Sequence, residues 1–318
     1  MLSYLRGKYW LINAGNTVKR FVRNCMICSR QRTNNTTQMM GDLPECRVTP
    51  SRPFLISGVD FAGPIDVRMS KGRGAKSYRG YIALFICMAT KAIHVEIVSD
   101  MTVDAFMAAF RRFISRRGPC REMWSDNGTT FVAASKEILE MWHQGKASIP
   151  KELESLLDSK STKWRYIPPG SPNFGGLWEA GVKSIKYHIK RTIGEATLTF
   201  EELYTVLVQI EACLNSRPLS PMSDHPDDFE PLTPAHFLVG ESLITVPERD
   251  LTDFKIHNLT RWRLLQKMMQ YFWKKWHVEY LSRLQERPKW MQLKKEFNVG
   301  DLVLMKIPNL PPSKWFLG

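Results

Sequence analysis

The chain has 318 residues and a formal net charge of +14, and 43% of its residues are hydrophobic. This length exceeds what one ordinary hydrophobic core needs and predicts two or three domains. The hydrophobic fraction is typical of globular proteins and excludes a disordered chain. Residues 81–90 form the most apolar run, which is too short to span a bilayer, so no membrane association is expected. Residues 1–10 already contain Arg6 and Lys8 and do not resemble a secretory signal, so secretion is not expected either.

The positive charge lies at the two ends of the chain. Residues 1–40 contain seven Lys or Arg and no acidic residue, whereas residues 255–318 contain thirteen Lys or Arg and four acidic residues. The stretch between them carries a net charge of −2. Basic flanks around a near-neutral centre favour a nucleic acid as partner, because each neutralised phosphate releases counterions. The alternative is that the basic ends only keep the protein in solution.

A closely spaced pair of cysteines, Cys25 and Cys28, follows a segment with a helical pattern. The spacing suits zinc, but a closed structural zinc site needs four ligands, and no histidine precedes the pair. Two small buried residues on a helix would give the same pattern. The six cysteines of the chain do not form a disulfide framework, which indicates a reducing compartment.

The next segment alternates strand and helix patterns. Strands are predicted at residues 54–61, 80–88, 92–98, 121–124 and 164–167, and helices at residues 103–117, 203–214 and 259–284. Gly63-Pro64 is expected to end the first strand. The proline-rich residues 220–234 predict a domain boundary, and the pattern alone supports a mixed α/β domain.

Three carboxylates occupy positions that suit a metal site. Asp60 lies in the first strand, Asp126 follows the fourth, and Glu179 begins a helix after a glycine-rich loop. Side chains at strand ends point into the mouth of a sheet, and oxygen ligands suit hard divalent cations. Two such cations can bind the attacking and leaving oxygens of a phosphoryl transfer. An isolated Asp-Asn-Gly, however, would be ordinary turn chemistry.

A stripe of lysines follows Glu179 along the same helix. Lys183, Lys186 and Lys190 lie four, seven and eleven positions after it, which places them on its face of the helix. Such a stripe suits a nucleic-acid end bound beside the carboxylates. A solvated helix face is the alternative.

The sequence motifs around the carboxylates resemble those of a known family. Gly-Val-Asp-Phe-Ala-Gly-Pro around Asp60, Ser-Asp-Asn-Gly-Thr-Thr-Phe around Asp126 and Gly-Leu-Trp-Glu-Ala-Gly-Val-Lys around Glu179 resemble the Asp-Asp-Glu triad of retroviral-type integrases. The likeness is greatest to the integrase of Bel/Pao-type LTR retrotransposons, and it covers nearly the whole chain. Many integrases have a shorter spacing between the second Asp and the Glu. We expect the surplus, residues 133–162, to loop out beside the sheet.

The resemblance implies a fold and a domain organisation. It implies a ribonuclease H-like integrase core, a mixed five-stranded sheet flanked by helices, at residues 48–240. Around this core it implies a partial zinc-binding domain of the His-His-Cys-Cys type at residues 1–40, a basic helical linker at 255–290 and the start of a small DNA-binding β-barrel at 291–318. The chain is therefore expected to be truncated at both ends.

The resemblance also implies roles for individual residues. Asp60, Asp126 and Glu179 would hold two Mg²⁺ or Mn²⁺ ions, with Asp60 bridging them. Lys183 and Lys186 would contact a DNA end, and Lys190 extends their stripe. Cys25 and Cys28 would bind Zn²⁺ only together with histidines upstream of this sequence.

The implied activity is removal of nucleotides at DNA 3′ ends followed by strand transfer into target DNA. The implied partners are double-stranded DNA, both element ends and target, and further copies of the same chain. The implied location is the nucleus, after a stage in a cytoplasmic particle. Two alternatives remain: a ribonuclease H-like nuclease that cuts and never joins, and a non-catalytic DNA-binding protein derived from an element.

Overall fold

The computed structural model describes most of the chain as two compact units, Met1–Leu43 and Pro44–Gly318. The described residues are 2–10, 12–26, 42–72, 74–147, 161–168, 172–194, 196–223, 228–243, 248–255, 259–284, 298–307 and 310–318. The first unit contains helices α1 (Leu2–Arg6) and α2 (Ala14–Asn24). The second unit contains the sheet and the three carboxylates.

The second unit is built on a mixed sheet with the strand order β3-β2-β1-β4-β5. Its strands are β1 (Ile56–Arg68), β2 (Ser77–Cys87), β3 (Ile93–Val98), β4 (Glu122–Ser125) and β5 (Lys163–Tyr166). Strands β1, β2 and β3 are antiparallel neighbours, whereas β4 runs parallel to β1 and β5 parallel to β4. A short strand, β6 (Leu198–Thr199), pairs with the end of β1. This order, with helices on both faces, confirms the ribonuclease H-like arrangement predicted from the sequence.

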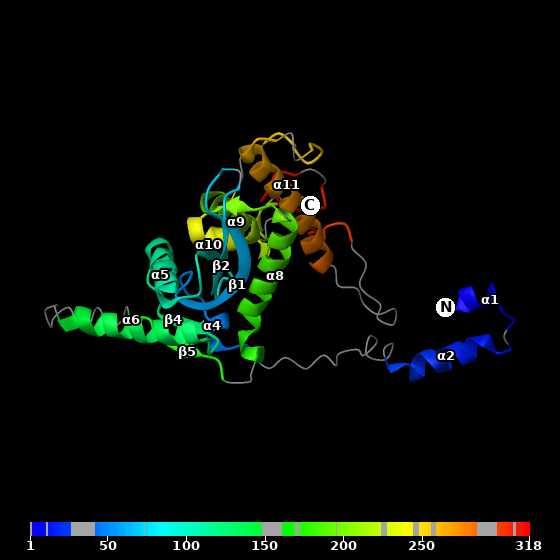
Figure 1. The fold of residues 1–318 in the computed structure, drawn as a ribbon, viewed down its shortest axis with the longest axis horizontal. Coiled ribbons are helices and arrows are strands. Elements are labelled where there is room, and N and C mark those ends of the chain that lie inside the picture. Colours follow the sequence, from blue (N-terminus) through cyan, green and yellow to red (C-terminus); the bar gives the residue numbers. More distant parts are fainter. Residues whose placement is uncertain are drawn as a thin grey trace. The chain divides into compact units, whose positions relative to one another are not determined.

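Helices cover both faces of this sheet (Figure 1). The helices of the second unit are α4 (Glu45–Val48), α5 (Val103–Arg117), α6 (Thr129–Ala147), α8 (Gly176–Ile193), α9 (Phe200–Asn215), α10 (Pro234–Val239) and α11 (Arg261–Leu284). Helices α5 and α6 pack on one face, whereas α8 and α9 pack on the other, with α11 outside them. None of the helices in the described part of the chain is long and apolar enough to cross a bilayer.

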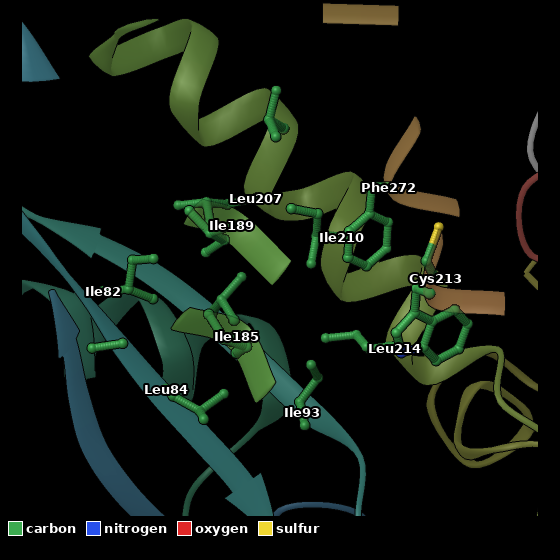
Figure 2. Packing of buried hydrophobic residues seen from close by; sticks show 14 of the residues in the cluster. Ile82, Leu84, Ile93, Ile185, Ile189, Leu207, Ile210, Cys213, Leu214 and Phe272 are labelled. Carbon is green, nitrogen blue, oxygen red and sulfur yellow. The ribbon is translucent and has the colours of Figure 1, made fainter. Parts of the chain in front are cut away.

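The alternation of side chains along β2 divides the core into two layers. Phe85 faces α5 and stacks on Phe113, with 4.2 Å between the ring centroids. Its neighbours Leu84 and Ile86 face the opposite way, into the layer formed with α8 and α9. Figure 2 shows this second layer. Its labelled members are Ile82, Leu84 and Ile93 of the sheet, Ile185 and Ile189 of α8, Leu207, Ile210, Cys213 and Leu214 of α9, and Phe272 of α11.

Helix α9 also covers the backbone of the edge strand β3. The amides of Ile93 and Val95 donate hydrogen bonds to Asn215 Oδ1 (2.9 Å) and Glu211 Oε2 (2.8 Å). Asn215 Nδ2 donates in return to the carbonyl of Ile93, also at 2.9 Å. Glu211 and Asn215 are one turn apart in α9, so they satisfy alternate residues of the strand. An edge that would otherwise expose unpaired backbone groups is thereby closed.

Two expectations from the sequence are wrong. Strand β1 does not end at Gly63-Pro64 but continues to Arg68, because a register shift between Ala62 and Ile65 accommodates the residue that has no N–H group. Residues 133–147 do not loop out either. They belong to α6, whose side chains Ala134 and Ile138 are buried against the aromatic layer under α5. Residues 148–160 of the surplus lie outside the described residues.

The C-terminal residues fold back onto α11. Val303 and Gly318 exchange two backbone hydrogen bonds, and Trp315 is buried between α11 and the end of α9. Its indole nitrogen donates to Ser216 Oγ at 3.3 Å. The described residues after 297 contain a single β-bridge, Leu304 with Leu317, and the barrel module stays a prediction.

Candidate active site

The first carboxylate lies in β1, and the second directly follows the adjacent parallel strand β4. Gly58 of β1 lies opposite Trp124 of β4, and Asp60 and Asp126 each follow two residues later. Because side chains two residues apart lie on the same face of a strand, Asp60 projects from the same face as Gly58, which α8 covers, and Asp126 directly follows the end of β4. The residue opposite Asp60 on β2 is Leu84, which packs in the layer beneath α8.

Helix α8 brings Glu179 over the same strand. The preceding residue, Trp178, is 1% exposed, and its ring lies directly on Gly58. A Cβ atom on Gly58 would stand only 2.4 Å from Trp178 Cε3, so glycine is the residue that allows this approach. Gly181 gives a second close approach, since a Cβ there would stand 2.4 Å from Ile86 Cδ1. The first turn of α8, with the exposed Glu179, therefore lies close above the β1 position that carries Asp60.

The charges of these groups act on one another. Asp60 is partly buried, and burial is the main cause that raises the pKa of its carboxyl to about 6. The amide of Phe61, which donates to Asp60 Oδ1 at 2.7 Å, lowers that pKa. The negative charges of Asp126 and Glu179 raise it further, whereas Lys186 lowers it. The four side chains therefore lie in one electrostatic environment.

The donor set suits a hard cation, although the carboxylates do not converge on one point. All three groups offer oxygen and none offers nitrogen or sulfur, which fits Mg²⁺ or Mn²⁺. Asp126 Oδ1 accepts a hydrogen bond from the nearby Gly128 amide at 3.0 Å. In the described part of the chain, no three His, Cys, Asp or Glu side chains are close enough together to hold an ion. Metal binding by this triad stays a prediction.

The lysine stripe lies on the exposed side of α8. Lys183, Lys186 and Lys190 are all exposed, on the same side of the helix as Glu179. Lys186 is near enough to Asp60 to lower its pKa, so the stripe begins beside the carboxylates. DNA contact by these three residues stays a prediction.

The predicted zinc ligands are only partly described. Cys25 directly follows α2 in the first unit and is partly buried. Cys28 lies outside the described residues. Zinc binding therefore also stays a prediction.

Gly58 and Trp178 were missed from the sequence, although they set the position of Glu179. The available signal was a glycine inside an apolar strand, which often marks the close approach of another group. The sequence does not show which group approaches, because Trp178 is far from Gly58 along the chain.

Solved structures similar to this chain include proteins of three viruses. One is the simian T-cell lymphotropic virus intasome in complex with PP2A regulatory subunit B56 gamma, with 13% identity, a TM-score of 0.40 and coverage of 74% of this chain and 70% of that one. Another is the HTLV-2 integrase catalytic core in complex with magnesium, with 17% identity, a TM-score of 0.32 and coverage of 52% and 88%. The BIV integrase catalytic core gives 13% identity, a TM-score of 0.36 and coverage of 59% and 95%.

These structural neighbours are retroviral integrases. At such low identity and overlap, the fold assignment rests on the order and directions of the strands in the sheet, and the activity is a separate question. Residues 260–318 match a family model described as a family of unknown function, DUF5641. That match covers α11 and the C-terminal residues and does not include the carboxylates. No curated protein matches the chain.

Proposed function

We propose that this protein is a metal-dependent integrase of an LTR retrotransposon, of the Bel/Pao type, which processes DNA 3′ ends and joins them to target DNA. The proposal rests on the placement of Asp60 in β1 and of Asp126 directly after the parallel strand β4, with the first turn of the helix that carries Glu179 packed on β1. The resemblance of the sequence motifs points to the same three residues.

In this proposal the three carboxylates hold two Mg²⁺ or Mn²⁺ ions. When bound, such ions lower the pKa of a water molecule and stabilise charge on the phosphate oxygens. Trp178 packs on Gly58 and thereby sets the distance between Glu179 and β1. Lys186, beside Asp60, attracts the phosphate backbone to the site and offsets the negative charge of the carboxylates.

Both chemical steps are displacements at phosphorus and need no covalent protein intermediate. In end processing, a water oxygen attacks the phosphorus, the scissile P–O bond breaks, and a 3′-hydroxyl is left on the DNA end. In strand transfer, this 3′-hydroxyl attacks a phosphorus of the target DNA, and the target's own 3′-oxygen leaves. The partners are therefore double-stranded element ends, target DNA in the nucleus and further copies of the chain.

Strand transfer with a labelled duplex that has a recessed 3′ end, and with a supercoiled plasmid, tests the proposal. We expect the wild-type protein to join label to plasmid when Mg²⁺ or Mn²⁺ is present. Glu179→Gln should form no joined product while it still binds the duplex, because it loses one metal ligand and no positive charge. Glu201→Gln is the matched control, since this glutamate has a side chain 82% exposed on α9.

Three results would contradict the proposal. If Glu179→Gln joins DNA at the wild-type rate, Glu179 is not part of the active site. Metal-dependent cutting without joining by the wild-type protein would favour the ribonuclease H-like nuclease. DNA binding with neither reaction would favour a non-catalytic protein.

A further inference from the structure

We infer that α11 extends the lysine-bearing side of α8 into one continuous binding surface for duplex DNA. This α8–α11 surface consists of Lys183, Tyr187, Arg191, Tyr271 and Lys275. The inference deepens the proposed function and rests on it for the choice of duplex DNA as the ligand. It gives a role to α11, which lies in the segment that matches a family of unknown function.

The α8 part of this surface is a single ridge of the helix. Lys183, Tyr187 and Arg191 follow one another at four-residue intervals, and all three are exposed. This ridge lies beside the ridge of Lys186 and Lys190, so the positive charge next to the carboxylates continues around the helix. It ends at the line along which α8 meets α11.

Side-chain contacts join the two helices along that line. The rings of His188 and Phe272 meet edge to face, with centroids 5.6 Å apart. Arg191 forms an ion pair of 2.7 Å with Glu279 of α11, and the Tyr187 hydroxyl donates to the same oxygen at 3.3 Å. The Arg191 guanidinium also lies 3.8 Å from the centre of the Tyr187 ring. No gap therefore separates the ridge of α8 from α11.

The adjoining side of α11 repeats this combination of a cation and an aromatic ring. Lys275 Nζ lies 4.4 Å from the ring centre of Tyr271, one turn earlier. Glu279 offsets the charge of Arg191, so the surplus positive charge of the α8–α11 surface comes from Lys183 and Lys275. Cations gathered on one continuous surface are typical of nucleic-acid binding.

Aromatic packing holds α11 in place, so Lys275 lies on a fixed support. Trp273 and Trp276 pack edge to face against Trp315, with centroid distances of 5.3 and 5.6 Å. Phe272 is 1% exposed and enters the layer formed with α8 and α9 (Figure 2). The backbone that carries Lys275 therefore keeps its position beside α8.

The chemistry of the surface favours duplex DNA over single strands. Single-stranded nucleic acids are bound by aromatic rings on which bases stack. Here Arg191 lies over the ring of Tyr187, and Lys275 lies over the ring of Tyr271. The cations therefore occupy the ring faces on which bases would stack. Two adjacent helices that present cations fit the regularly spaced phosphates of a duplex backbone.

The test measures binding of a fluorescent blunt duplex by anisotropy, in EDTA, over a range of salt concentrations. We expect Lys275→Gln to reduce the slope of log K against log salt concentration by about 0.9, the value for one lost phosphate contact. Lys183→Gln combined with Lys275→Gln should reduce it by about twice that amount. Lys275→Arg should preserve the slope, and thermal melting of each variant checks that the fold is intact.

Lys274→Gln is the matched control. Lys274 precedes Lys275 on the same helix and is exposed, but its charge lowers the pKa of Asp250. Equal slopes for Lys274→Gln and Lys275→Gln would overturn the inference, as would a Lys275→Gln slope equal to that of the wild-type protein. Competition by polyglutamate or by single strands as strong as that by duplex DNA would overturn the choice of ligand.

The two proposals fail in different ways. Metal-free binding reports on the α8–α11 surface alone, whereas strand transfer reports on the carboxylates. If the slope of log K against log salt concentration depends on Lys275 but the wild-type protein joins no DNA, the α8–α11 surface is supported and the integrase proposal is contradicted. If the wild-type protein joins DNA and Lys275→Gln leaves the salt-dependence slope unchanged, the integrase proposal is supported and the α8–α11 surface is contradicted.

Discussion

Gly58→Ala tests whether the contact between Trp178 and β1 sets the position of Glu179. The added Cβ atom would stand 2.4 Å from Trp178 Cε3, closer than any normal carbon contact. The indole is rigid and buried, so it cannot rotate away, and the first turn of α8 must rise from the sheet. Overpacking of this kind costs about 1–3 kcal/mol of unfolding free energy. In a domain of this size the melting temperature should fall by about 2–4 °C per kcal/mol.

The effect on activity should exceed the effect on stability. Displacing Trp178 also displaces Glu179, and small shifts of catalytic groups are costly because the reacting atoms must stay aligned. We expect strand transfer to fall about 100-fold, measured at a temperature where the variant is folded. Gly58→Ala combined with Trp178→Leu should recover part of the lost stability, because the smaller side chain makes room for the added methyl group.

Two glycines of α8 provide controls for Gly58→Ala. A Cβ on Gly176 would have nothing within 4 Å, so Gly176→Ala should leave stability unchanged or raise it by about 0.4–1 kcal/mol. A Cβ on Gly181 would meet Ile86 Cδ1, the end of a flexible side chain, so the loss should be smaller than at Gly58. If Gly58→Ala melts and joins DNA like the wild-type protein, the proposed role of this contact is wrong.

Three further predictions concern the rest of the second unit. Burial raises the pKa of Asp60 to about 6, so in the metal-free protein its ionisation opposes folding as the pH rises through that value. Asp60→Asn should therefore raise the unfolding free energy at about pH 8 by on the order of 1–2 kcal/mol, with little gain below about pH 4, in urea denaturation with EDTA; equal gains at both pH values would contradict this. Asn215→Ala leaves the N–H and C=O of Ile93 unpaired at a buried edge and should cost about 2–4 kcal/mol in the same assay, and a loss below experimental error would show that the edge is not closed by α9. Trp315→Ala should release residues 310–318 from α11 and increase their amide hydrogen exchange while exchange in β1 and β2 stays unchanged; protection equal to that of the wild-type protein would show that Trp315 does not anchor them.

Elements with strong local signals could be predicted from the sequence. The helix predicted at residues 103–117 has its observed limits, because Thr102 caps it and Gly118 ends it. The strands predicted at residues 80–88 and 92–98 differ from β2 and β3 by a few residues at their ends. The fold follows from this strand and helix order together with the motif resemblance.

Features that depend on contacts between distant residues could not be predicted. Much of α6 was missed because its exposed side carries Leu139 and Met141, so its buried apolar positions do not stand out. The contact of Trp178 with Gly58 and the contact of Trp315 with α11 each join segments that are remote in the chain. The sequence indicated which carboxylates to consider, but not how α8 approaches β1.

Anomalous diffraction from crystals soaked in Mn²⁺ tests most directly whether Asp60, Asp126 and Glu179 form one metal site. We expect a manganese peak bonded to carboxylate oxygens of Asp60 and Asp126, with Glu179 turned towards the same ions. This expectation is contradicted if Mn²⁺ binds elsewhere on the protein while the space between these three side chains contains no peak.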